Sequence, residues 1–529
     1  MPSDCITYEK SGYYSKIIVD YLNQATAVAP FYNRFPTEDN FKDQIAEKQA
    51  NFPLYNRSVL VKELQLQYQA IENSAAVTAN ISLLSDENTF TITTGHQLNL
   101  FTGPLYFLYK IIATINLCKQ LTSSNSPHKF VPIYWMATED HDFEEINYFN
   151  YKNLKIKWSK PSNGPVGRLS TKGLQDVLKV FETQLGSSTN AKYLINLFEK
   201  AYLNHQTLAA ATRYLANELF KKDGLVIIDS DSQSLKKLFV PYFKQELLQQ
   251  TSYKSVSETN KQLNNYTIQV NPREINLFFI ENDLRERIIF DNGYFKINNT
   301  KIVFTTQEIT AELENHPEKF SPNALLRPLY QEVILPNLAY IGGGGEIAYW
   351  MQLKATFAIF KTTFPILVLR NSALLVSEKQ LKKMVALKLS AADLFLKRDN
   401  LLTKKVNELS HIPIDFSVLK ETLKNQFELL KNSAKQTDQT FIGAVKAQET
   451  KQIRGLLHLE KRLIKAEKRV YQETLSRISD IQEELFPNQS LQERTQNFSE
   501  FFIEHGFNLF TKISDNLNPL TPTFSIIYL

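Results

Sequence analysis

A dense group of ionisable side chains stands in the stretch TEDHDFEEIN, residues 138–147. Carboxylates beside a histidine serve as general acids and bases, so Asp140, His141 and Asp142 are candidate catalytic residues. Glu139 is a candidate contact to substrate. The same oxygen groups also suit a divalent cation, although no metal-site spacing such as H-E-x-x-H is present, and we assign no metal ligand. A third interpretation is that part of the group caps the following helix.

Small and polar residues gather in a second stretch, TGHQLNLFTGPLYFLYK, residues 94–110. His96 and Gln97 offer hydrogen bonds, and Lys110 offers a positive charge unless it only extends along the helix to the surface. The Thr102 hydroxyl suits a helix cap, a role compatible with ligand binding. The candidate substrate-binding residues of this stretch are Thr94, Gly95, His96, Gln97, Thr102, Gly103 and Lys110.

Four consecutive glycines, residues 342–345, follow a predicted strand and open a predicted helix. Glycine lets a ligand approach the backbone, and a helix N-terminus offers free N–H groups with partial positive charge. The next residue, Glu346, would repel a phosphate and suit an ammonium group of a ligand. The alternative is a tight turn against a neighbouring element. The candidate substrate-binding residues here are Gly343, Gly344, Glu346, Tyr349 and Trp350.

Two arginines stand where a ligand carboxylate would meet them. Arg327 precedes a proline inside an apolar helical stretch, and Arg370 ends a predicted core strand. A guanidinium holds a carboxylate through two parallel hydrogen bonds, so both are candidate substrate-binding residues. A structural ion pair is the equally weighted alternative for each.

The elements that carry these groups form a βαβ pattern. A strand over residues 88–94, an apolar helix over 105–121 and a strand over 129–138 follow one another within about 50 residues, as in a βαβ unit. Further strands are predicted over 223–232 and 364–372, and a hairpin over 287–305 with residues 291–293 as its turn. Ligands of open α/β sheets bind beyond the carboxyl ends of the strands. We therefore expect an α/β fold with a mostly parallel sheet whose loops share one crevice.

A helical segment without strand patterns runs from residue 376 to 486. Apolar residues at spacings of three and four over residues 456–485 predict one long helix in a coiled coil or bundle. We expect three segments: a core over 1–375 with inserted helices and a hairpin, a helical coiled-coil domain over 376–486, and a C-terminal segment over 487–529 whose last strand rejoins the sheet.

Composition excludes several classes of protein. The net charge of +5 comes without long runs of like charge, which argues against nucleic-acid binding. Two cysteines are too few for a disulfide framework. The N-terminal residues lack the apolar core of a signal peptide, and no stretch is apolar enough to span a membrane. We expect a soluble cytoplasmic protein.

At these motifs the sequence resembles the BshC family, the cysteine-adding enzymes of bacillithiol biosynthesis. The matching stretches are TGHQLNLFTGPLYFLYK, PIYWMATEDHDFEEIN, RPLYQEVILPNLAYIGGGGEIAYW and PNQSLQERTQNF. They are long and specific, and they span most of the chain. The resemblance implies a Rossmann-like core and a coiled-coil domain that pairs two subunits into a homodimer.

The resemblance also implies a reaction, the joining of the cysteine carboxyl to the amino group of glucosaminyl-malate as the last step of bacillithiol formation. A carboxylate is a poor acyl donor, so we expect ATP with Mg²⁺ as the activator and no tightly bound cofactor. Arg327 or Arg370 would hold the malate carboxylates. Two alternatives stay open, namely a metal-dependent hydrolase that uses the acidic group over 139–145, and a non-catalytic dimeric scaffold.

Overall fold

The computed structural model describes residues 4–72, 74–124, 127–437 and 439–529. The chain folds into two compact units. The core unit runs to Leu374 and includes Gln492–Ile527 and Leu529, and the helical unit comprises Leu375–Leu491 with Tyr528. The sequence places the two divisions after residues 375 and 486, and the structure has them after 374 and 491.

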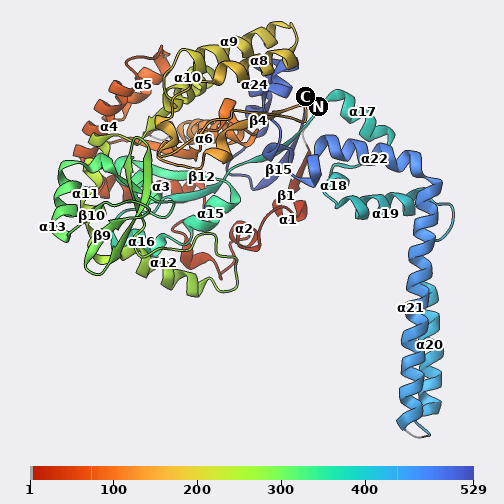
Figure 1. The fold of residues 1–529 in the computed structure, drawn as a ribbon. Coiled ribbons are helices and arrows are strands. Elements are labelled where there is room, and N and C mark those ends of the chain that lie inside the picture. The colour runs from red at the N-terminus through yellow and green to blue at the C-terminus, as the bar shows by residue number, and fades with distance from the viewer. Residues whose placement is uncertain (1–3, 73, 125–126, 438) are drawn as a thin grey trace. The chain divides into compact units, whose positions relative to one another are not determined.

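A parallel sheet of five strands lies in the core unit, in the order β13-β12-β2-β3-β6 (Figure 1). All neighbouring strands run parallel. β2 and β12 are buried along their whole length, as strands of a parallel sheet covered on both faces are. The predicted α/β fold with a mostly parallel sheet is confirmed. The strands are β2 Thr89–His96, β3 Lys129–Met136, β6 Val226–Asp229, β12 Asn337–Gly342 and β13 Ile366–Leu369.

Helices connect the strands of this sheet and pack around it (Figure 1). Those of the core unit are α1 Tyr8–Ser11, α2 Lys16–Leu22, α3 Glu38–Asn51, α4 Leu54–Gln67, α5 Ala75–Leu83, α6 Tyr106–Ser123, α7 Phe143–Ile146, α8 Leu174–Leu185, α9 Thr189–Leu203, α10 Leu208–Phe220, α11 Gln233–Gln249, α12 Thr251–Gln262, α13 Thr306–Asn315, α14 Arg327–Ile334, α15 Gly344–Trp350, α16 Lys354–Ile359, α23 Ser499–His505 and α24 Asn508–Asn516.

The connection from β2 to α6 is an irregular loop, after which the helix predicted over residues 105–121 begins. The helix begins only at Tyr106, because Phe101, Thr102 and Gly103 all have positive φ, at 47°, 68° and 63°. Such angles cost energy for residues other than glycine and persist only where neighbours hold them. The Asn497 side-chain amide donates to the carbonyls of Phe101 (2.8 Å) and Gly103 (2.5 Å) and so fixes the loop. Thr102 does not cap the helix, and its hydroxyl is buried without a hydrogen-bond partner.

A second, antiparallel sheet has the order β10-β9-β8-β7-β11. Its predicted hairpin is confirmed, since Asn292 and Gly293 both have positive φ in the turn between β8 and β9. The hairpin of β4 Tyr148–Tyr151 and β5 Leu154–Lys157 was not predicted. The strands of this second sheet are β7 Leu277–Glu281, β8 Leu284–Asp291, β9 Tyr294–Ile297, β10 Val303–Phe304 and β11 Phe320–Pro322.

The last strand, β15 Thr523–Tyr528, does not rejoin the parallel sheet. It pairs antiparallel with β1 Asp4–Thr7 at the beginning of the chain. The strand expected over 364–372 also ends early, because β13 stops at Leu369 and a separate strand, β14 Ser372–Val376, follows Arg370. Both differences arise from long-range pairing that local patterns do not encode.

The helical unit consists of helices, with no strand between residues 377 and 491 in the ranges that the structure describes. The long helices α20 and α21 pack against each other around Phe427, Ala434 and Val445. Ion pairs at Lys420–Glu460 (3.1 Å) and Lys431–Glu449 (2.6 Å) fix an antiparallel register. The helices of the unit are α17 Glu378–Ala386, α18 Ala391–Leu394, α19 Arg398–Leu409, α20 Ser417–Ala434, α21 Gln439–Val470 and α22 Gln472–Leu485.

The single helix predicted across residues 456–485 is wrong, because the backbone leaves helical geometry at Tyr471, between α21 and α22. Apolar residues of the predicted seam stay uncovered within the unit: Leu459 is 53% exposed and Val470 70%. None of the helices in the described ranges is long and apolar enough to cross a bilayer.

Glu500 on α23 makes the stability of the core unit pH-dependent. Burial raises the pKa of this carboxyl from 4.5 to about 7, despite hydrogen bonds from the backbone of Lys152 and Asn497. The folded state therefore binds a proton that the unfolded state releases between these values, and stability falls as pH rises through that window. At pH 8 Glu500→Gln should be more stable than the wild type. Its advantage in the free energy of unfolding should be about 1–3 kcal/mol larger at pH 8 than at pH 5.

The measurement is denaturant unfolding followed by tryptophan fluorescence. All three tryptophans, Trp135, Trp158 and Trp350, lie in the core unit, so the signal reports that unit alone. Glu504→Gln, at an exposed position of the same helix, serves as the control and should show no such pH dependence. If the stability difference between Glu500→Gln and the wild type were the same at both pH values, the raised pKa of Glu500 would be contradicted.

Candidate active site

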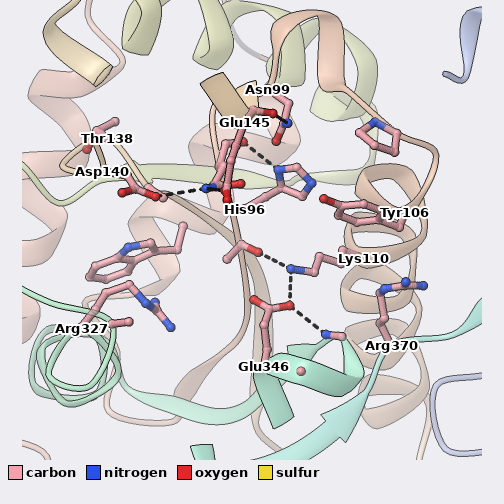
Figure 2. Close-up of a pocket in the computed structure, with 18 of the residues that line it drawn as sticks. His96, Asn99, Tyr106, Lys110, Thr138, Asp140, Glu145, Arg327, Glu346 and Arg370 are labelled. Carbon is pink, nitrogen blue, oxygen red and sulfur yellow. Dashed lines mark hydrogen bonds and ion pairs between the residues drawn. The ribbon is translucent and has the colours of Figure 1, made fainter. Parts of the chain in front are cut away.

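A cavity of about 700 Å³ opens where β2, β3 and β12 end. Gly95, Asp140 and Gly344, from three loops far apart in the sequence, all line it. Small-molecule sites typically have volumes of roughly 300–1,000 Å³. Figure 2 shows how side chains from these loops converge. The other predicted site residues that line the cavity are His96, Gln97, Lys110, Glu139, Arg327, Gly343, Glu346, Tyr349 and Arg370.

Lys110 and Glu346 form an ion pair inside the cavity (Figure 2). Lys110 Nζ lies 2.5 Å from Glu346 Oε2 and donates to the Gly95 carbonyl at 2.7 Å. The carboxylate also accepts the Gly343 N–H at 2.8 Å and the Tyr340 hydroxyl at 2.7 Å. Burial raises the pKa of Glu346, but the Lys110 ammonium and these hydrogen bonds outweigh it and hold the pKa below its ordinary value. The ammonium group opposite Glu346 is thus the protein's own.

The glycine run does not fit a nucleotide phosphate. The Gly343 N–H is already bonded to Glu346, whose carboxylate would repel a phosphate. None of the four glycines has a positive φ. A Cβ added to Gly344 would make only ordinary contacts, 3.5 Å to Ile18 and 3.6 Å to Tyr14. Gly343, Gly344 and Gly345 therefore serve as an open wall of the cavity rather than as a phosphate cradle.

The acidic group over 139–145 does not converge on one point. Glu139 turns inward, pairs with the buried Lys236 and accepts a hydrogen bond from Ser321 at 3.1 Å. His141 and Asp142 are exposed and do not line the cavity. In the ranges with described placement, no three His, Cys, Asp or Glu side chains are arranged to hold a metal ion.

Asp140 stays in the cavity as a carboxylate with several donors. It accepts Gln97 Nε2 at 3.1 Å and the backbone N–H of His141 at 2.8 Å, and Arg285 Nη1 lies 4.0 Å away. Burial raises its pKa, but the bonds to His141 and Gln97 and the Arg285 charge hold the pKa far below its ordinary value. Gln97 also donates to Glu145 at 2.8 Å, so one amide links two carboxylates. Because an effective general base needs a pKa near the working pH, Asp140 suits binding a cation better than removing a proton.

Arg327 is a half-buried charge in the wall of the cavity. It forms no ion pair with any residue that the structure describes, and its Nη2 is buried without a hydrogen-bond partner. The guanidinium lies 5.4–5.8 Å from the ring centres of Trp135, Tyr340 and Trp350, and Nη1 donates to Gln331 at 3.0 Å. Burial lowers its pKa, but Tyr349, Tyr340 and the Glu346 carboxylate outweigh this and raise the pKa above its ordinary value. An anionic ligand would supply the missing partner.

Arg370 is by contrast already paired. Its Nη2 lies 2.6 Å from Glu493, which is fully buried, and Nη1 donates to Ser372 at 3.0 Å and to the Asn371 carbonyl at 3.1 Å. Burial lowers its pKa, but the Glu493 carboxylate outweighs this and raises the pKa above its ordinary value. Of the two interpretations that the sequence left open for Arg370, the structural ion pair is present.

Several predicted site residues lie outside the cavity. Thr94 donates its hydroxyl to the Ile341 carbonyl inside the sheet, and Trp350 stacks on Tyr340 in the core with ring centres 4.4 Å apart. Thr102 and Gly103 belong to the loop that Asn497 holds. The remaining two are the exposed His141 and Asp142 described above.

The structure adds lining residues that sequence reasoning missed: Asn99, Tyr106, Arg285, Tyr340 and Arg494. Asn99 and Tyr106 stand inside the stretch 94–110 and carry polar groups, so the same reasoning would have reached them. Arg285 lies on β8 of the antiparallel sheet, and Arg494 follows the helical unit in sequence. Nothing local to Arg285 signals that it returns to this cavity, whereas Arg494 stands in the family-matching stretch PNQSLQERTQNF.

Two family profiles together cover the chain. "Bacillithiol biosynthesis BshC, N-terminal Rossmann-like domain" matches residues 1–371, and "Bacillithiol biosynthesis BshC, C-terminal coiled-coil domain" matches residues 373–529. The Rossmann-like core and the coiled-coil domain expected from the sequence are therefore confirmed.

Similar full-length proteins carry one name, "Putative cysteine ligase BshC". That of Flavobacterium johnsoniae is 60% identical over 100% of both chains. That of Flavobacterium psychrophilum is 58% identical over 100% of this chain and 99% of its own, and that of Cytophaga hutchinsonii is 36% identical over 98% and 97%. A crystal structure titled "putative arginyl t-RNA synthetase" from Campylobacter jejuni aligns with 87% of this chain and 95% of its own at 10% identity. Its TM-score of 0.21 is too low to carry any argument.

Proposed function

Since the chain belongs to the BshC family of bacillithiol biosynthesis proteins, we propose that it is a cytoplasmic ligase that joins the carboxyl group of L-cysteine to the amino group of glucosaminyl-malate. The product is an amide, bacillithiol. The observation that carries the proposal is similarity along the whole chain to relatives named as cysteine ligases.

The charges of the cavity support this substrate. Arg327, which forms no ion pair among the described residues, is the group that a malate carboxylate would meet. We assign this role to Arg327 rather than to Arg370, which Glu493 already neutralises. Asp140 and Glu145, linked by Gln97, are the carboxylates that would hold an ammonium group of a substrate. A ligand with two carboxylates at one end and an amine at the other matches both.

The activating co-substrate is proposed on chemical grounds. A free carboxylate does not acylate an amine at a useful rate, and ATP with Mg²⁺ is the simplest source of activation. Its phosphates do not fit the glycine run, where Glu346 already bonds to the Gly343 N–H. We therefore assign no residue of this run to the nucleotide.

We also propose that two subunits associate through the helical unit. Leu459 and Val470 of α21, and Leu429 of α20, leave 53%, 70% and 71% of their surfaces exposed. Apolar surface of this kind is costly in water and is covered in coiled-coil pairs. Size-exclusion chromatography with light scattering would measure the mass.

The metal-dependent hydrolase is the weaker candidate. It requires the acidic group over 139–145 to gather around one cation, whereas Glu139 pairs with Lys236 and Glu144 pairs with Lys157 at 2.9 Å. A non-catalytic scaffold does not explain why Arg327 lines the cavity without an ion pair among the described residues.

The test is a reconstituted reaction. Purified full-length protein is incubated with L-cysteine, glucosaminyl-malate, ATP and Mg²⁺, and thiols are labelled and identified by mass spectrometry. We expect bacillithiol only when both substrates and ATP are present. The exposed Asp142→Asn is a matched control for the acidic group and should keep its activity within about twofold.

A deletion strain of the source bacterium gives the second readout. We expect it to accumulate glucosaminyl-malate and to lack bacillithiol until the wild-type gene is restored. Normal bacillithiol in that strain, or consumption of glucosaminyl-malate without cysteine in the reconstituted reaction, would overturn the proposal.

A further inference from the structure

Two buried hydrogen-bond acceptors line the cavity without a donor. They are His96 Nε2 and Asn99 Oδ1, and neither has a hydrogen-bond partner among the described residues. His96 is 6% exposed and Asn99 7%. Buried polar atoms in native proteins are nearly always bonded, and an orphaned one costs about 1–3 kcal/mol. Two unbonded acceptors, three residues apart in one cavity wall, therefore indicate a ligand that supplies hydrogen-bond donors.

The protonation state of His96 follows from its contacts. Nδ1 lies 2.7 Å from the Gln97 carbonyl, which only accepts, so Nδ1 carries the hydrogen. Burial and the nearby Lys110 charge lower the pKa of His96 to about 3, so the ring is neutral and Nε2 bears a lone pair. The rings of Tyr106 and Phe107, with centres 5.2 and 5.0 Å away, hold the imidazole in place. His96 thus accepts one hydrogen bond through Nε2 and transfers no proton at neutral pH.

Asn99 is fixed in a corresponding way. Its Nδ2 donates to the Glu145 carbonyl at 3.3 Å, which leaves Oδ1 as the free acceptor. The side chain packs so closely on Gly103 that a Cβ there would lie 2.6 Å from the Asn99 Cβ. Gly103, with its φ of 63°, is therefore needed to admit Asn99.

The Arg327 side of the cavity has unbonded hydrogen-bond donors instead of acceptors. Arg327 Nη2 and Arg285 Nε are buried donors without partners, so the cavity carries orphaned donors in one region and orphaned acceptors in another. Figure 2 shows His96 and Asn99 toward the upper part of the view and Arg327 at the lower left. A ligand that satisfies both must bear acceptors at one end and N–H or O–H donors at the other.

We propose that His96 Nε2 and Asn99 Oδ1 form an acceptor subsite that binds hydroxyl groups of the sugar ring, while Arg327 binds the carboxylates. This subsite rests on the proposed function and deepens it, because it fixes the direction in which glucosaminyl-malate lies. His96 and Asn99 are specificity-determining residues on this assignment. A ligand end without donors is rejected because it leaves both acceptors unbonded.

The test is calorimetric titration of the full-length protein with two probes, glucosaminyl-malate and L-malate. His96→Phe keeps a flat ring between Tyr106 and Phe107 but removes the acceptor. Asn99→Leu keeps the volume and removes Oδ1. For each variant we expect glucosaminyl-malate to bind about tenfold more weakly, and L-malate to bind within about twofold of the wild type. His96→Gln, whose Oε1 is an acceptor, should restore most of the affinity for glucosaminyl-malate.

The outcomes separate the two proposals. Loss of both probes in parallel, or unchanged binding of glucosaminyl-malate in both His96→Phe and Asn99→Leu, would overturn the acceptor subsite alone. A wild-type protein that binds no glucosaminyl-malate would overturn the substrate assignment and the subsite with it. Tryptophan fluorescence unfolding of each variant confirms that the core unit is folded, since all three tryptophans lie there.

Discussion

Replacing Arg327 with Met should raise KM for glucosaminyl-malate by about thirtyfold or more, since loss of one partner of a desolvated charge pair costs about 2–5 kcal/mol. Arg327 forms no ion pair with any residue that the structure describes, so the ligand carboxylate is the partner that is lost. Steady-state kinetics of bacillithiol formation, with glucosaminyl-malate varied at saturating cysteine, measure the effect.

Two further variants sharpen that experiment. Arg327→Lys keeps the charge but not the planar fork, so it should recover only part of the loss. Arg494→Met removes another arginine that lines the cavity, but an exposed one, where solvent screens the charge, and should change KM by less than about fivefold. Equal effects of Arg327→Met and Arg494→Met would show that general positive charge, rather than a carboxylate site at Arg327, attracts the substrate.

Replacing Glu493 with Gln should destabilise the core unit by about 3–5 kcal/mol, the usual cost of leaving a buried charge without its partner. The Glu493 carboxylate accepts from Arg370 Nη2 at 2.6 Å, from the Ser372 hydroxyl at 3.1 Å and from the Ala373 N–H at 3.3 Å. Gln cannot neutralise the Arg370 guanidinium, which is 5% exposed. Denaturant unfolding read by tryptophan fluorescence gives the free energy of unfolding of this unit.

A double variant tests the cause. Arg370→Met with Glu493→Gln removes the orphaned charge and should recover part of the lost stability. Glu314→Gln, which removes half of an exposed pair with Lys244 at 3.0 Å, is the surface control and should change stability little. A double variant no more stable than Glu493→Gln alone would place the loss in the hydrogen bonds to Ser372 and Ala373 instead of in the charge.

Local patterns were sufficient to predict the parallel strands. β2 and β3 are runs of β-branched and aromatic residues buried on both faces, and the polar residues that follow them mark the edge where the cavity opens. The same reasoning brought the loops of Gly95, Asp140 and Gly344 to one crevice. Periodicity also predicted the helical unit, but not the break at Tyr471, where no proline or glycine interrupts the pattern.

The ion pairs between residues far apart in the chain could not be predicted from the sequence. Glu346 appeared to need a ligand ammonium, and only the structure shows that Lys110 supplies it. Arg327 and Arg370 were equivalent candidates, and what distinguishes them is a carboxylate 123 residues further along the chain, Glu493. Sequence spacing carries no information about such contacts, because the fold alone decides which buried charge meets another.

The cavity depends on residues made late in synthesis. Arg494 and Thr495 line it, and Asn497 holds the loop of Phe101 to Gly103, yet all three follow the entire helical unit in sequence. A growing polypeptide on the ribosome consequently cannot complete its binding pocket until the codons up to that of Asn497, beyond the helical unit, are translated. Truncated products that end within the helical unit would leave the early strands in place but lack the part that closes the pocket, so they would neither capture nor consume metabolites.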